Sequence, residues 1–184
     1  HVGVVHLTDR TMLWTAELGT AELGEDYAAE FAFSRRQPLM AWGTGKQHRF
    51  ALVDLATGRT LHERLAGRKI SALGLDPNGH FAVIAGTEDA VLLDADTGAD
   101  IAVLADPFGR TSDLYSDRGL AWTVAGDRLA LASDDGVNIY AASTGERVAS
   151  LGPWPFVPHA LAWSPDGTRL AVASLEDRIH VFEP

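Results

Sequence analysis

The C-terminal stretch of the chain, residues 159–184, consists of three short apolar runs separated by polar turns. The runs 160–163 and 170–173 flank a Ser-Pro-Asp-Gly turn at 164–167, and a second polar turn precedes 179–182, where side chains alternate. Turn residues at intervals of about eight to ten positions between strand-type runs are typical of an antiparallel meander. This stretch therefore predicts a small antiparallel sheet.

The same pattern recurs along the chain. First strands are predicted at 30–34, 70–76, 119–124 and 160–164, second strands at 39–43, 81–86, 129–133 and 170–174, and third strands at 50–55, 90–95, 137–141 and 179–182. Fourth strands are predicted at 60–65, 100–104 and 147–151. The N-terminal runs 2–7 and 12–18 resemble a third and a fourth strand. The chain is thus one segment, 1–184, with repeats at approximately 1–19, 26–67, 68–106, 117–152 and 157–184.

Glycines mark the turns of these repeats. Gly58, Gly98 and Gly145 each follow a threonine between the predicted third and fourth strands. Glycine supplies the positive φ that a tight hairpin turn requires. The spacing of these glycines is wider at the second interval, and an insertion at 106–117 accounts for the difference.

The residue pattern of the repeats resembles that of the WD40 family. Residues 161–167 and 170–174 are similar to the first and second strands of a WD40 repeat, and 134–140 is similar to its next turn and third strand. A four-strand unit of about 40–45 residues is also the β-propeller period. No Trp-Asp dipeptide ends a third strand; Phe182-Glu183 and Tyr140-Ala141 stand there instead. The hydrogen-bond network usual in that family is therefore expected to be largely absent.

The resemblance implies an all-β fold, a WD40-like β-propeller of about four to five blades with four antiparallel strands each. The predicted strands do not fill whole blades, so we expect an incomplete ring whose open sheet edges favour self-association. The predicted core comprises Leu73, Val83, Leu92, Leu120, Leu129, Leu131, Leu161, Leu170 and Val172.

Composition limits the possible partners. The formal net charge of −10 opposes binding to phosphate backbones, so no nucleic-acid partner is expected. The chain has no cysteine, which excludes disulfides and thiolate metal sites. No apolar run is long enough to span a bilayer, so no membrane association is expected, and we predict a cytoplasmic location.

Three short motifs suggest chemistry, and each has a structural interpretation that we favour. His62-Glu63 lacks the second histidine of a zinc-binding HExxH pair. The stretch 43–46, Gly-Thr-Gly-Lys, lacks the first glycine and the Ser/Thr of a phosphate loop. The acidic pairs 88–89, 134–135 and 176–177 recur at one turn, where Asp side chains stabilise the turn backbone. No cofactor, metal or catalytic residue is predicted.

An aromatic and proline-rich connection at 153–159 is the strongest candidate for partner binding. Trp154, Phe156 and His159 lie in it, and Phe108, Arg110 and Tyr115 lie in the equivalent connection upstream. Aromatic and arginine side chains in such connections are typical of protein-binding hot spots. These six residues are predicted to share one rim. The alternative is that Trp154 and Phe156 cover the core between blades.

The sequence thus predicts a non-catalytic scaffold that binds a protein or peptide on its rim. Two alternatives remain open. One is a propeller enzyme or substrate-gating domain of the quinoprotein or peptidase type. The other is a fragment of a larger protein whose activity lies in a missing domain.

Overall fold

The computed structural model describes residues 2–5, 12–16, 29–44, 48–67, 70–86, 89–105, 119–133, 136–174 and 178–184. Within these ranges, all regular secondary structure is β-strand, and the strands number seventeen. The predicted all-β class and the predicted number of strands are therefore confirmed.

The strands form a hairpin and four sheets. The N-terminal hairpin consists of β1 (Val2–Val5) and β2 (Met12–Ala16). Sheet I consists of β3 (Ala29–Phe33), β4 (Leu39–Thr44), β5 (Arg49–Asp54) and β6 (Thr60–Leu65). Sheet II consists of β7 (Ala72–Leu75), β8 (Phe81–Ala85), β9 (Asp89–Asp94) and β10 (Asp100–Ala105). Sheet III consists of β11 (Leu120–Trp122), β12 (Arg128–Ser133), β13 (Gly136–Ala141) and β14 (Arg147–Leu151). Sheet IV consists of β15 (Pro158–Trp163), β16 (Leu170–Ser174) and β17 (Ile179–Phe182).

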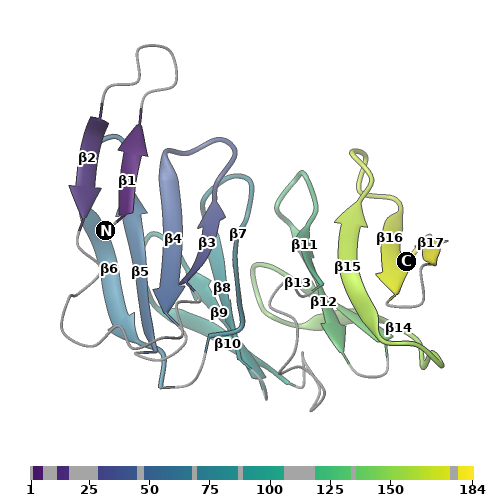
Figure 1. The fold of residues 1–184 in the computed structure, drawn as a ribbon. Helices are drawn as coiled ribbons and strands as arrows, with labels where there is room; N and C mark the ends of the chain where they lie inside the picture. The colour runs from purple at the N-terminus through teal and green to yellow at the C-terminus, as the bar shows by residue number, and fades with distance from the viewer. Residues whose placement is uncertain are drawn as a thin grey trace.

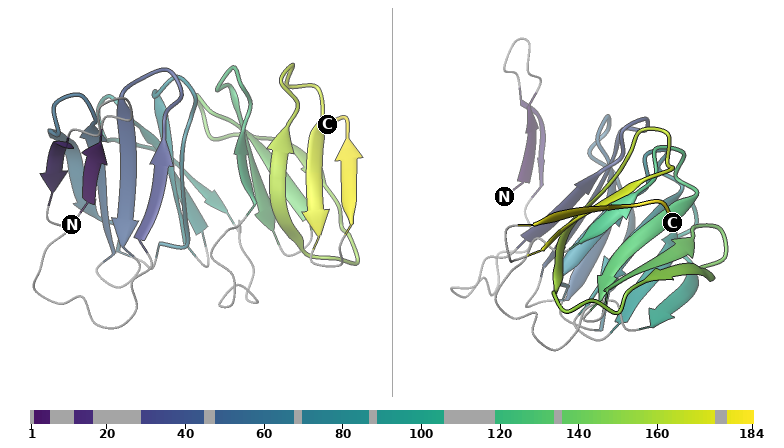
Figure 2. Two further views of the ribbon diagram at one scale, coloured as in Figure 1. Left: turned by 45° about the horizontal axis from the view of Figure 1, so that its top comes forward. Right: turned by 90° about the vertical axis from the view of Figure 1, so that its right-hand side faces the viewer.

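The sheets are meanders that stand in an open row. Each strand pairs antiparallel with its neighbour in the chain, so the order in space follows the order in sequence. The sheets follow one another in chain order, with the hairpin at one end and sheet IV at the other (Figures 1 and 2). Among the described residues, no strand pairing joins the hairpin to sheet IV. The row therefore forms no closed ring.

Apolar side chains fill the three junctions between successive sheets. We call the side of a sheet that points to the next sheet its forward face, and the opposite side its rear face. The I–II junction contains Phe50 and Leu52 against Leu73 and Ile84. The II–III junction includes Leu92 and Leu129, and the III–IV junction includes Ile139, Leu170 and Val172. Both faces of the inner sheets are therefore packed, which explains why their strands lack polar alternation.

Small residues on forward faces make room for large residues on rear faces. A Cβ added at Gly74, on the forward face of sheet II, would lie 2.6 Å from Leu120 Cδ2 and 3.0 Å from Trp122 Nε1. A Cβ added at Gly119, at the start of sheet III, would lie 2.9 Å from Leu161 Cγ. Close packing of this kind tolerates little added volume, so the size pattern determines which faces fit together.

Most of the predicted core is buried, with two corrections. Leu73, Val83, Leu92, Leu129, Leu131, Leu170 and Val172 are buried as predicted. Leu120 and Leu161 are only half-buried. Both lie on the first strand of a sheet, which is an edge strand, so neighbours cover them incompletely.

The N-terminal hairpin has the register of the outer hairpin in the full sheets. In β1–β2, Val5 pairs with Met12 and a register shift separates this pair from the rest of the ladder. The same shift, at the same spacing, precedes the pairs Val53–Thr60, Leu93–Asp100 and Tyr140–Arg147. Gly58, Gly98 and Gly145 in the three full sheets have φ of 71°, 72° and 69°, as predicted for these turns. The hairpin therefore has the backbone geometry of the outer half of a sheet.

Candidate binding site on the turn rim

The turns between the first and second strands of sheets I–IV lie along one edge of the row. We call this edge the turn rim; its turns are 34–38, 76–80, 123–127 and 164–168. In three of them a glycine has positive φ: Gly79 (78°), Gly126 (77°) and Gly167 (70°). Glycine adopts this conformation without the steric cost that a side chain brings. The turns of sheets II, III and IV thus share one local chemistry, and the turn of sheet I lies beside them without the glycine.

Asp76 organises the turn of sheet II. Asp76 is fully buried, and its carboxylate accepts hydrogen bonds from the backbone N–H groups of Asn78 (2.9 Å), His80 (2.6 Å) and Phe81 (2.8 Å). A buried carboxylate is tolerated when such donors surround it. The acid in this turn is therefore a structural residue that holds the backbone in place.

Hydrogen bonds tie the first three turns of the rim together. The Arg36 guanidinium donates to Asn78 Oδ1 (2.8 Å), and the Asn78 amide donates to the carbonyl of Ala125 (2.7 Å). The Ser34 hydroxyl and the Arg36 backbone N–H both donate to the carbonyl of Pro77, each at 3.0 Å. Asn78 thereby links sheets I, II and III at their turns.

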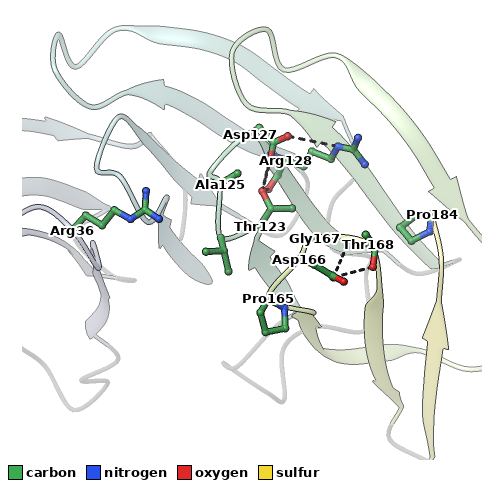
Figure 3. A pocket seen from close by; sticks show the side chains of 11 residues that line it. Arg36, Thr123, Ala125, Asp127, Arg128, Pro165, Asp166, Gly167, Thr168 and Pro184 are labelled. Atoms are coloured by element: carbon green, nitrogen blue, oxygen red, sulfur yellow. Dashed lines mark hydrogen bonds and ion pairs between the residues drawn. The ribbon is translucent and has the colours of Figure 1, made fainter.

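A cavity of about 600 Å³ lies between the turns of sheets III and IV. We call it the rim pocket. Thr123, Ala125 and Asp127 line one side, and Pro165 and Asp166 line the other. Arg36 approaches from sheet I, while Arg128 and Pro184 lie at the far side (Figure 3). Most of the lining residues thus belong to two neighbouring turns.

The carboxylates in the pocket are engaged by their own turns. Asp166 accepts hydrogen bonds from the hydroxyl of Ser164 (2.6 Å) and from the backbone N–H and hydroxyl of Thr168 (3.0 and 2.8 Å). These bonds, with Ser164 contributing most, lower the pKa of Asp166 to about 2. Asp127 accepts a hydrogen bond from the Thr123 hydroxyl at 2.6 Å.

The two arginines of the pocket have guanidinium N–H donors that are available to a ligand. Arg128 Nε lies 3.9 Å from Asp127 Oδ2, beyond hydrogen-bond distance, and the Arg128 side chain is about half exposed. A guanidinium offers five N–H donors, and Arg36 uses one of them on Asn78. The pocket therefore suits a ligand with carbonyl or carboxylate acceptors.

A second cavity, of about 440 Å³, lies on the same rim between sheets I and II. His62 Nε2 lies 2.9 Å from the carbonyl of Asp96, and His80 Nδ1 lies 3.6 Å from Asp96 Oδ2. His62 and Glu63, considered above for zinc, lie on β6, and Glu63 pairs with Arg49. Among the residues that the structure describes, no group of three or more His, Asp or Glu side chains is placed to hold a metal ion.

The predicted aromatic connection lies at the opposite rim, where β14 ends and β15 begins. Trp154 stacks on Phe156 (ring centroids 5.0 Å apart) and on Phe182 (4.7 Å), and Phe156 stacks on His180 (4.6 Å). Trp154 also packs against the III–IV core. This arrangement is the one expected if the two rings cover the core between sheets. Partner binding by these residues remains a prediction.

The remaining predicted site residues are placed only in part. His159 is half-buried on β15. Phe108, Arg110 and Tyr115 lie outside the described residues, as do most residues of the acidic pairs and 45–46 of the Gly-Thr-Gly-Lys stretch. The rim pocket was not predicted from the sequence, because its residues belong to turns that also have a structural explanation.

Comparisons with known proteins support the fold alone. No family model matches the chain, and no curated protein matches it either. The crystal structure of the computationally designed Ika4 protein is similar in fold. The match has a TM-score of 0.65 and 14% sequence identity, and it covers 88% of this chain and 94% of that chain. The part of the chain that the structure describes has no helix of the length and apolarity that a membrane crossing requires.

Proposed function

We propose that the chain is a non-catalytic scaffold of the WD40-like propeller type that binds a protein or peptide on its turn rim. The WD40-like repeats provide successive sheets whose turns project side by side. The observation that carries the proposal is the rim pocket, which opens between two turns whose backbones are held by their own Asp, Ser and Thr side chains. Its volume lies within the usual range for small binding sites.

The chemistry of the pocket favours an extended peptide. The Oδ1 atoms of Asp127 and Asp166 accept hydrogen bonds from their own turns, and the half-exposed Arg128 guanidinium is a donor for a ligand. Pro165 and Pro184 add rigid apolar surface. A peptide carbonyl or carboxylate beside Arg128, with a small apolar side chain against the prolines, satisfies both kinds of surface.

The test is a peptide-display selection on the purified chain, followed by fluorescence anisotropy with the selected peptides. Arg128→Ala should weaken binding by at least about fivefold, because a hydrogen bond to a charged group contributes about 1.5–3 kcal/mol. Ala125→Trp should abolish binding by filling the pocket. Arg178→Ala is the matched control, since it removes an exposed arginine next to the opposite rim.

Two outcomes would contradict the proposal. If no peptide is selected, the scaffold function is wrong. If Val157→Ser, in the aromatic connection, weakens binding while the two pocket variants bind normally, the binding surface is the opposite rim and the rim pocket is not the site. Val157 is suited to this comparison because its side chain is exposed.

A further inference from the structure

The forward face of sheet IV is apolar and uncovered. Strand register places Ala160, Ala162, Ala171, Ala173, Ile179 and Val181 together on this face. Ile179 and Val181 are 75% and 63% exposed. The opposite face of the sheet packs against sheet III through Leu161, Trp163 and Leu170. Within the described strands of sheet IV, this face carries no charged side chain, and contiguous apolar surface of this kind often marks an interaction site.

The same positions are buried in every earlier sheet. The strand register makes Leu52, Leu92 and Ile139 the equivalents of Val181, and these three are at most 1% exposed. The equivalents of Ile179, namely Phe50, Ala90 and Val137, are at most 2% exposed. In each case the rear face of the next sheet covers them. Sheet IV therefore presents the forward half of a fourth junction of the same kind.

On sheet I, only the first strand of the matching half is exposed. Phe31 and Phe33 lie on β3, point to the rear face, and are 42% and 58% exposed. Phe33 occupies the position of Trp122 in sheet III and of Trp163 in sheet IV. On β4 and β5, the next two strands of the same face, Met40, Trp42 and Val53 are buried. Within the described ranges, the rear face of β3 thus lacks the preceding sheet that packs against β7, β11 and β15, the first strands of the other sheets.

The size pattern of the closed junctions fits the first strands of these two faces together. Trp122 lies against Gly74, and the indole N–H of Trp163 donates to the carbonyl of Ala121 at 3.1 Å. The equivalent of Gly74 and Ala121 on sheet IV is Ala162, which is exposed. A large ring on a first strand therefore meets a small residue on the first strand of the preceding sheet. Among the described residues, Phe33 is a ring without such a small residue against it, and Ala162 is a small residue without such a ring.

We propose that sheet IV of one copy docks its forward face onto the rear face of sheet I in a second copy, with Ala160 and Ala162 against Phe31 and Phe33. Sheets II and III separate these two faces within a single copy, as Figures 1 and 2 show, so the contact forms between molecules. The contact is head to tail, because the two surfaces differ. Copies joined in this way form a closed ring or an open chain according to the rotation between them.

The test is sedimentation equilibrium of the 184-residue chain up to about 100 µM, where an association of micromolar Kd is populated. The mass should rise with concentration. Ala162→Glu and Phe33→Glu should each remain monomeric at low micromolar concentration, where the unsubstituted chain is assembled. Ala56→Glu, at an exposed turn of sheet I, is the matched control and should assemble normally.

Mixing the two variants tests the head-to-tail geometry. Each variant retains one intact face, so an equimolar mixture should form a 1:1 dimer and nothing larger. The unfolding midpoint of each variant in urea should stay close to that of the unsubstituted chain, since both side chains are exposed in a single copy.

Three results would overturn the inference. The first is a chain that stays monomeric throughout the concentration range. The second is assembly that Phe33→Glu leaves unchanged, which would indicate pairing between β17 edges instead. The third is a mixture of the two variants that forms no dimer. The inference does not rest on the rim pocket, and Ala162→Glu should leave peptide binding at that pocket unchanged.

Discussion

The carboxylate of Asp76 provides the acceptors for three backbone N–H groups in the turn of sheet II. Three backbone N–H groups point at its carboxylate, and none of them has a strand partner at that point in the ladder. In the equivalent turns, hydroxyl groups accept backbone N–H bonds: Ser34 from Gln37, Thr123 from Arg128 and Ser164 from Arg169. The side chains differ, but each supplies an acceptor to the backbone of its own turn.

At the residue scale, we predict that Asp76→Ala lowers the free energy of unfolding by about 2–4 kcal/mol, because several buried N–H donors lose their acceptor. Urea denaturation monitored by tryptophan fluorescence measures this loss. Asp76→Asn should lose less, since its amide oxygen still accepts. Glu146→Ala, which removes an exposed turn carboxylate, should change stability by less than about 0.5 kcal/mol. Equal losses for Asp76→Ala and Glu146→Ala would show that the buried hydrogen bonds contribute little.

Strands β13 and β17 occupy the same position in their sheets but have different surroundings. β13 has a neighbouring strand on each side and a sheet against each face, whereas β17 has a strand on one side and a packed sheet against one face. Both strands are apolar enough to be buried. The neighbouring elements, rather than the strands' own composition, decide how much each contributes to stability.

At the element scale, we predict unequal costs for equivalent truncations. Ile139→Ala on β13 should cost about 2–5 kcal/mol in urea denaturation, since it leaves a cavity between sheets III and IV. Val181→Ala on β17 should cost less than about 1 kcal/mol at protein concentrations where the chain is monomeric. A loss at Val181 as large as at Ile139 in the monomer would mean that another part of the same copy covers sheet IV.

In the part of the chain that the structure describes, the sheets stand in a row and each packs against its neighbours. Three apolar junctions join the four sheets, and the Asn78 hydrogen bonds connect three of the turns. Stability in such an array is the sum of the sheets and the junctions between them. Sheet II has a junction on each face, and sheet IV has a junction on one. The row therefore has a more stable interior than end.

At the scale of the molecule, we predict faster hydrogen exchange in sheet IV than in sheet II. In dilute solution, the amides of β15–β17 should exchange through local opening, whereas those of β7–β9 should be protected close to the level of global unfolding. Hydrogen-exchange mass spectrometry at two protein concentrations measures this difference. Protection of β15–β17 should increase at the concentration where copies associate. Uniform protection at both concentrations would contradict the prediction.

Local chemistry made much of this fold readable from the sequence. Glycines at positive φ, Asp and Ser in turns, and short apolar runs between them act within a few residues, so the strands and their antiparallel order could be predicted. The boundaries of individual strands differ by one or two residues where a predicted strand end belongs to a turn, as at Ser34. The same local signals predicted the positive φ of Gly58, Gly98 and Gly145.

The candidate site and the exposed faces depended on contacts between sheets. The side chains of β17 have the same apolar character as those of β13, yet Val181 is exposed and Ile139 is buried, because only Ile139 has a sheet in front of it. Likewise, hydrogen bonds of Asn78 join the turns of sheets I, II and III, whereas the rim pocket lies between the turns at 123–127 and 164–168. The sequence by itself determined the strands, the turns and the size pattern of each face. The tertiary structure decided which of those faces are covered and where the turns leave a pocket, since burial is a property of neighbours distant in the chain.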